Sequence, residues 1–117
     1  MKENKLLQLA QELAVDIITV SRIVHEKREL ALADQVKRSG TSISANVSEG
    51  NHPQSRADMI SKFEIALKEA NETENWLVIF KDSGLVDSEI IDTVRKKLIK
   101  IKILLISSIK TLKARQK

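Results

Sequence analysis

Apolar side chains recur at alternating steps of three and four residues along most of the chain, and this spacing constrains the fold more than any other feature. It is clearest near the C-terminal end, in the series Ile91, Val94, Leu98, Ile101, Leu105, Ser108 and Leu112. An α-helix completes a turn every 3.6 residues, so such a series forms one continuous face. The N-terminal stretch has the same property, with Leu6, Leu9, Ala10, Leu13, Ile17, Val20 and Val24 on one side. We therefore predict long helices that each bury one face.

Few residues interrupt this pattern, since the chain contains only three glycines and one proline. We place helix ends at Gly50, which is expected to adopt the left-handed cap conformation shortly before Pro53, and at Gly84. Ser55 is expected to cap the third helix, with Asp58 in a capping-box arrangement. The turn between the first two helices contains neither Gly nor Pro, so only pattern and length place it near residues 25–29.

These boundaries give four helices, at about residues 3–25, 29–50, 55–82 and 88–114, in a single domain that spans residues 1–117. A short connection cannot carry the chain back along a helix of about 30 Å or more, so consecutive helices must run in opposite directions. The predicted fold class is all-α, an antiparallel up-down-up-down four-helix bundle.

The composition excludes several classes of function. The chain has no cysteine, which removes disulfides, thiolate chemistry and Cys-based zinc sites and fits a reducing compartment. The N-terminus opens into a helix that contains Glu12 and Asp16, so it lacks the apolar core of a signal peptide. Residues 99–109 are apolar but include two lysines and are too short to span a bilayer. We expect a cytoplasmic protein without membrane contacts.

The stretch from Arg38 to Gly50 resembles a loop in composition, because eight of its thirteen residues are Ser, Thr, Gly or Asn. Its apolar and small positions nevertheless keep the helical spacing, at Leu32, Val36, Gly40, Ile43 and Val47. We interpret it as a helix whose small side chains let neighbouring backbones approach closely. Beside this face runs a polar stripe inside the bundle, interpreted as structural: Gln35, Ser42, Asn46 and Glu49.

One carboxylate falls on a face that is expected to be buried. Glu74 lies in line with Phe63, Leu67 and Leu77, and a buried charge needs a partner. Counting along antiparallel helices from the turn near Gly84 puts Glu74 level with Lys97. We therefore predict a Glu74–Lys97 ion pair.

Catalytic and metal chemistry find little support in the residues. The sole Glu-x-x-His match, Glu49 to His52, lies at a helix end, and the helix that would carry a zinc-protease motif at His25 lacks the second His. The serines between residues 39 and 48 are interpreted as packing residues, because the two histidines flank their helix at its ends. We expect no catalytic residue, cofactor, metal ion or small-molecule substrate.

Residues of the second and third helices resemble a known family. The first block is Leu32-Ala33-Asp34-Gln35, Arg38 to Ile43, Ala45-Asn46-Val47 and Glu49-Gly50; the second is Ser55-Arg56-Ala57-Asp58, Lys62-Phe63, Ile65 to Ala70, Glu72-Thr73, Trp76-Leu77 and Ser83-Gly84-Leu85. This pattern resembles the bacterial four-helix-bundle proteins related to the 23S rRNA intervening-sequence protein. It covers about residues 30–86. Ser44 departs from the Pro or Gly usual in that family, so a weaker local bend is expected there.

The resemblance implies a homo-oligomeric bundle, commonly a pentameric ring, without known catalytic activity. Some relatives are encoded within ribosomal RNA insertions. Similar proteins assist diversity-generating reverse transcriptases by binding nucleic acid and the enzyme. The resemblance therefore suggests RNA or a nucleic-acid enzyme as a partner, beside the chain itself.

The outer faces of the last two helices favour assembly independently of that resemblance. On the third helix one stripe combines apolar and acidic residues, Ile65, Glu69, Glu72, Trp76 and Ile79. On the fourth helix the side opposite the core carries Ile99, Ile103 and Ile106, flanked by Arg95, Lys96 and Lys110. Two different complementary patches on one chain make a head-to-tail contact, which closes into a ring if the rotation permits. Isolated surface isoleucines are normal, but three at helical spacing are not isolated.

Basic residues are concentrated at the C-terminal end. From Arg95 to Lys117 there are nine Lys or Arg and no acid, so the net charge of +4 comes from the last helix. Such a helix is the footprint expected of phosphate binding, and we predict nucleic-acid contacts by Arg95, Lys96, Lys110, Lys113, Arg115 and Lys117. Only three aromatic residues are available to stack on bases, so binding should be mostly to the backbone.

Two alternatives to a nucleic-acid adaptor stay open. The lysines could serve only to solvate an exposed helix and complement its C-terminal dipole, in a protein-protein interaction scaffold that binds no nucleic acid. An enzyme is the third hypothesis, and stoichiometric iron or zinc in the purified protein would support it.

Overall fold

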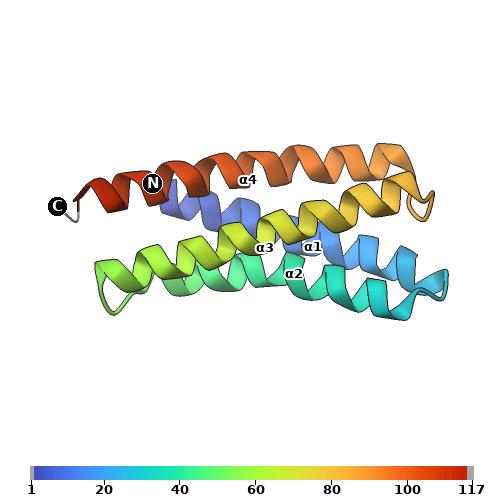
Figure 1. Cartoon of the computed structure of the whole chain (residues 1–117), viewed down its shortest axis with the longest axis horizontal. Coiled ribbons are helices and arrows are strands. Elements are labelled where there is room, and N and C mark those ends of the chain that lie inside the picture. Colours follow the sequence, from blue (N-terminus) through green and yellow to red (C-terminus); the bar gives the residue numbers. More distant parts are fainter. Residues whose placement is uncertain (1, 116–117) are drawn as a thin grey trace.

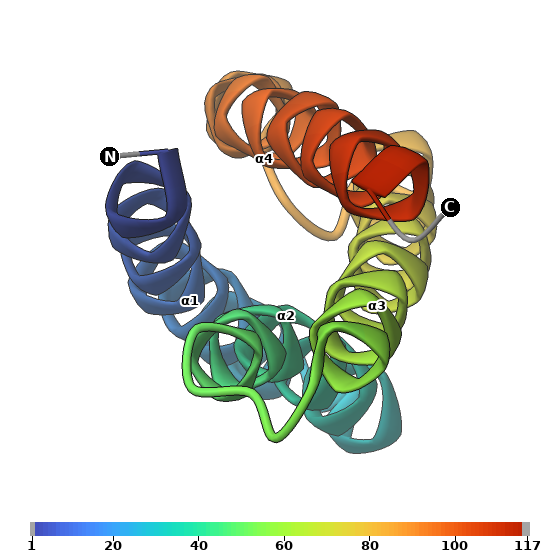
Figure 2. The ribbon, with the colours of Figure 1, turned by 90° about the vertical axis from the view of Figure 1, so that its left-hand side faces the viewer.

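The computed structural model describes residues 2–115, and they form an elongated bundle of α-helices measuring 49 × 21 × 19 Å (Figure 1). The helices are α1 (Lys2–Glu26), α2 (Leu30–Gly50), α3 (Arg56–Asp82) and α4 (Ser88–Arg115). Each helix runs antiparallel to the one before it, and α4 also packs against α1. Seen from one end, the helices surround a common axis (Figure 2). The predicted all-α antiparallel four-helix bundle is confirmed.

The core follows the faces that the spacing predicts. Its fully buried side chains include Leu6, Ala10, Leu13, Ile17, Val20 and Val24 from α1; Val36, Ile43 and Val47 from α2; Phe63, Ala66, Ala70, Leu77 and Phe80 from α3; and Ile91, Leu98, Ile101 and Leu105 from α4. One departure occurs near the end of α4, where Ile109 is buried and Ser108 is only half-buried. A strict repeat of 3.5 residues drifts around a helix of 3.6 residues per turn, which moves the next residue into the core.

Helix α2 continues without interruption through the serine-rich stretch. A Cβ atom added to Gly40 would lie 2.5 Å from Cγ2 of Ile17 in α1, and one added to Gly50 would lie 2.5 Å from Cε1 of Phe63 in α3. Between α2 and α3, the Thr73 and Ser39 hydroxyl oxygens form a buried hydrogen bond of 2.9 Å. The predicted close approach of neighbouring helices at the small residues of α2 is therefore confirmed.

The prediction that Gly50 adopts a left-handed cap is wrong. Among the described residues, positive φ angles occur only at Arg28 and Gly84. Helix α2 ends at Gly50, and its C-cap residue Asn51 has an ordinary right-handed φ of −77°. Gly50 is required for space against Phe63 rather than for its backbone freedom. Gly84 does take the left-handed conformation, with φ of 76°, directly after the C-cap of α3.

The start of α3 is capped as predicted. The Ser55 hydroxyl accepts a hydrogen bond of 3.0 Å from the Asp58 backbone N–H. The Asp58 carboxylate in turn accepts from the backbone N–H of Gln54, at 3.2 Å, one residue earlier than in a standard capping box.

No helix in the described part of the chain is both long and apolar enough to cross a membrane.

Candidate oligomer and nucleic-acid surfaces

The α3 stripe, defined as Ile65, Glu69, Glu72, Trp76 and Ile79, forms a single face because its members follow one another at steps of four and three residues. Ile65 and Ile79 are each 39% exposed, and Trp76 and Glu69 are half-buried. The stripe runs beside Thr73, whose hydroxyl bonds to Ser39 of α2. It therefore lies on the side of α3 next to α2, at the surface of the bundle.

The ionised form of Glu69 in this stripe is disfavoured by its surroundings. Partial burial and the neighbouring Glu72 carboxylate raise the pKa of Glu69, and the nearby Lys68 offsets the rise only in part. A cation brought against this stripe would relieve the repulsion between the two carboxylates. The stripe is thus suited to a basic partner surface.

The α4 outer face combines exposed isoleucines with exposed lysines: Lys96, Ile99, Lys100, Ile103, Ile106 and Lys110. Ile103 is 60% exposed, more than the other isoleucines of this face. Within residues 2–115, Lys96, Lys100 and Lys110 form no ion pair. This face therefore offers apolar area and positive charge together.

Four other cations of α4, Arg95, Lys97, Lys102 and Lys113, form ion pairs within the chain. Lys102 Nζ lies 2.7 Å and Arg95 Nη2 3.4 Å from the two Glu74 carboxylate oxygens of α3. Lys97 Nζ lies 2.9 Å from Asp16 Oδ2 of α1. These pairs tie α4 to both of its neighbours. The hydrogen bond from Lys102 is the main cause of the lowered pKa of Glu74, and the bond to Asp16 is the main cause of the raised pKa of Lys97.

The predicted Glu74–Lys97 pair is accordingly wrong. The two residues were matched by their level along antiparallel helices, which takes no account of direction around the helix axis. Each residue turns a helix by 100°, so Lys97 lies about 200° from Arg95 and points toward α1. Glu74 is instead reached by two residues of α4 that face α3, Arg95 and Lys102.

The residues predicted to contact nucleic acid differ in their surroundings. Arg95 and Lys113 form ion pairs within the chain, the latter with Glu64 at 2.9 Å. Lys96 and Lys110 lie on the α4 outer face. Arg115 is exposed, and its backbone carbonyl accepts a hydrogen bond of 2.7 Å from Arg56. Lys117 lies outside the described residues.

The polar stripe of α2 lies at the edge of the contact with α3. Ser42 donates to the Arg38 carbonyl oxygen at 2.7 Å, and the Asn46 amide donates to the Ser42 carbonyl oxygen at 2.8 Å. Gln35 and Glu49 are exposed, so the prediction that they lie inside the bundle is wrong. The small side chains of Ser39 and Thr73 fill the buried position instead.

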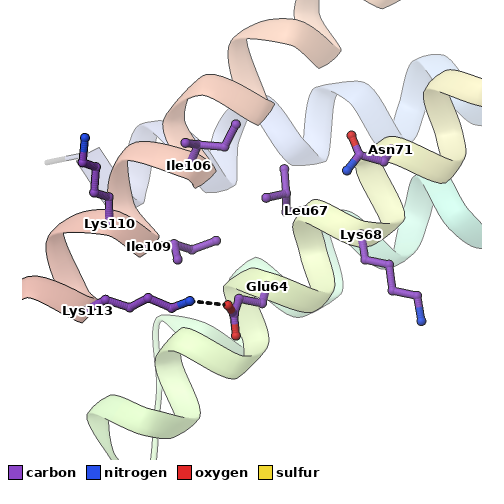
Figure 3. A pocket seen from close by; sticks show the side chains of 8 residues that line it. All are labelled: Glu64, Leu67, Lys68, Asn71, Ile106, Ile109, Lys110 and Lys113. Carbon is purple, nitrogen blue, oxygen red and sulfur yellow. Dashed lines mark ion pairs between the residues drawn. The ribbon is translucent and has the colours of Figure 1, made fainter. Parts of the chain in front are cut away.

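A groove between α3 and α4, with a volume of about 640 Å³, was not predicted from the sequence. Leu67, Ile106 and Ile109 point into it, and the Glu64–Lys113 ion pair crosses one end (Figure 3). Its remaining lining residues are Lys68, Asn71 and Lys110. Ile106 thus belongs both to this α3–α4 groove and to the α4 outer face. The residue that could have indicated this groove is Ile109, an apolar residue that a strict seven-residue repeat assigns to the surface.

Among residues 2–115, no group of three or more His, Asp or Glu side chains is arranged to hold a metal ion. The described site features are therefore surfaces: one acidic and apolar, one basic and apolar, with an apolar groove between their helices. These features define a helical-bundle protein with two unlike outer faces.

Comparison with known proteins identifies the family. The model described as 23S rRNA-intervening sequence protein matches residues 2–107, and the chain belongs to this family. A crystal structure of a protein with unknown function from the S23 ribosomal protein family of Bacteroides thetaiotaomicron is 42% identical in sequence. The match covers 94% of this chain and 99% of that chain, with a TM-score of 0.89. No curated protein matches the chain. The resemblance of the second and third helices to this family is confirmed.

Proposed function

We propose that this protein is a non-enzymatic homo-oligomer, assembled head to tail into a ring, that presents basic residues to RNA or to a nucleic-acid-processing partner in the cytoplasm. The observation that carries the proposal is the presence of two unlike, complementary faces on one chain. The α4 outer face alternates isoleucines with lysines that form no ion pair in residues 2–115, and the α3 stripe alternates isoleucines with Glu69 and Glu72.

The chemistry of the two faces is complementary. Docking the α4 outer face of one copy on the α3 stripe of the next would remove exposed apolar area from water on both sides. It would also bring Lys96, Lys100 or Lys110 close to the two glutamates and relieve the repulsion that raises the pKa of Glu69. Because the two faces differ, each copy uses one face on each side, which is the arrangement that generates rings. The resemblance to the family favours five copies.

The RNA part of the proposal is supported by charge. The chain has a net charge of +4, and a ring would multiply it. Arg115 lies in the last turn of α4, outside the α4 outer face, where it can reach phosphates. Contacts by Lys96 or Lys110 would require the α4 outer face to open, and contacts by Arg95 or Lys113 would require their ion pairs to break.

The assembly is tested by a substitution in the centre of the α4 outer face. Ile103→Asp should reduce the mass measured by light scattering to that of a single chain. The substitution places a carboxylate in the apolar contact, near the glutamates of the α3 stripe in the next copy. Thr111→Asp, at an exposed position of α4 that is not part of the α4 outer face, is the matched control and should leave the mass unchanged. Helix content by circular dichroism should be equal in all three proteins. An unchanged mass for Ile103→Asp would refute the choice of face.

Binding of a structured RNA at two salt concentrations separates the adaptor from the protein-only scaffold. An adaptor that contacts phosphates should bind more weakly as salt increases, because bound counterions are released on binding. A protein with no salt-sensitive RNA binding would be the scaffold.

A further inference from the structure

A second positively charged feature lies on the opposite pair of helices, between α1 and α2. This α1–α2 hollow has a volume of about 440 Å³ and is lined by Ser21, Arg22, His25, Leu30, Ala33, Asp34 and Lys37. Its floor is open because both helices place small side chains there: Ser21 and Ala33 are buried, with 6% and 4% of their surfaces exposed. The longer polar side chains stand around that floor and are exposed.

The basic side chains of this hollow differ from those of α4 in their partners. Arg22, His25 and Lys37 form no ion pair among residues 2–115, whereas Arg95, Lys97, Lys102 and Lys113 of α4 all do. The one carboxylate in the lining is Asp34, which lies 3.9 Å from the Arg38 guanidinium just outside it. The lining therefore holds two cations, Arg22 and Lys37, against the one carboxylate, and His25 adds a further ring N–H donor.

The turn at the end of α1 adds a further cation at a conformational cost. The Arg28 N–H donates to the His25 carbonyl oxygen at 2.9 Å, and the Glu29 N–H donates to the Val24 carbonyl oxygen at 3.3 Å. These two bonds form a Schellman motif with Arg28 at the left-handed position, where φ is 66°.

Glycine is the usual residue at such a position, because a Cβ atom is strained there. The chain itself uses glycine in the corresponding place after α3, at Gly84 with φ of 76°. At the end of α1 it carries an arginine instead, three residues after His25 of the hollow. A strained residue at a surface turn is a pointer to function rather than to stability.

We propose that the α1–α2 hollow is a phosphate-binding site for an RNA backbone, in which Arg22, His25 and Lys37 donate to phosphate oxygens and Arg28 adds charge at the rim. The inference rests on the proposed RNA function for its ligand, but not on the ring. The hollow uses neither the α4 outer face nor the α3 stripe, so it stays open when those faces are covered. RNA binding by this protein is then centred on α1 and α2, and the C-terminal cations of α4 contribute less.

The test measures binding of a fluorescently labelled RNA hairpin by anisotropy over a range of salt concentrations. Arg22→Gln/Lys37→Gln should weaken binding and lower the salt slope by about two, one for each lost phosphate contact. Lys5→Gln/Lys68→Gln removes the same charge from exposed positions outside the hollow and is the matched control. It should change the slope by much less.

A second variant separates loss of binding from loss of folding. Arg28→Gly removes the strain at the left-handed position, so its melting temperature should rise by about 2–5 °C while its affinity for the hairpin falls. Arg28→Lys keeps the charge and should bind as the wild type does. Equal affinities for wild type, Arg28→Gly and Arg22→Gln/Lys37→Gln would overturn the site. Failure of the wild type to bind the hairpin even at low salt would overturn both this site and the proposed RNA function.

Discussion

Helices α2 and α4 are held in the bundle by different means. Helix α2 is fixed by shape: Gly40 and Gly50 leave no room for a Cβ atom against α1 and α3, and Ser39 bonds to Thr73 in the buried contact. Helix α4 is fixed in addition by charge, through partly buried ion pairs to α1 and α3. The difference implies that the packing of α2 tolerates a change of pH but not a larger side chain at its small residues. The attachment of α4 should respond to pH.

The largest expected effect comes from filling the space at α2. Gly40→Val should lower the free energy of unfolding by about 3 kcal/mol, because its Cβ alone would lie 2.5 Å from the stiff, fully buried Ile17 side chain. Urea denaturation measures the change. Ala45→Val adds the same kind of side chain to an exposed position of α2 and should change stability by no more than about 0.5 kcal/mol. Similar losses at the two positions would mean that α2 is not held by close packing.

A smaller effect is expected at the charged side of α4. Glu74→Gln should lower the free energy of unfolding by about 1–2 kcal/mol at neutral pH, because Arg95 and Lys102 lose the carboxylate that they share. The same urea experiment measures it. A loss as large as that of Gly40→Val would contradict the assignment of close packing as the stronger constraint.

The two variants should also differ in how their loss of stability depends on pH. The pKa of Glu74 in the folded protein lies below its ordinary value of 4.5, chiefly because of the hydrogen bond from Lys102. The carboxylate therefore contributes stability above the ordinary value, and this contribution is lost as the pH falls through the lower folded pKa. The difference between wild type and Glu74→Gln should be full at pH 7 and should shrink below about pH 4.5. The loss caused by Gly40→Val should persist there.

Spacing alone predicted most of the fold, because helical periodicity reports which side chains share a face. The core of α4 shows the limit of this reasoning, since a fixed repeat assigned Ser108 rather than Ile109 to the interior. Gly50 shows another limit: a glycine at a helix end can serve backbone freedom or close packing, and only the position of Phe63 decides between them.

The candidate surfaces were predicted in part. The isoleucines of the α4 outer face are exposed, as the pattern indicated, but the ion pairs of Arg95, Lys97 and Lys113 depend on the rotation of neighbouring helices, which no single helix encodes. The turn at Arg28 gave no sequence signal, because arginine is uncommon at a left-handed position. The α1–α2 hollow combines residues from two helices. It was missed because its shape depends on how those helices are rotated relative to each other.

The proposed function depends above all on assembly through the α3 stripe and the α4 outer face. This assembly is tested by the mass of the wild-type protein in solution, measured by light scattering at physiological salt. A ring-forming protein should give a single species at a multiple of 13.2 kDa, with five copies for the pentamer. A mass of 13.2 kDa that does not change with protein concentration would contradict it.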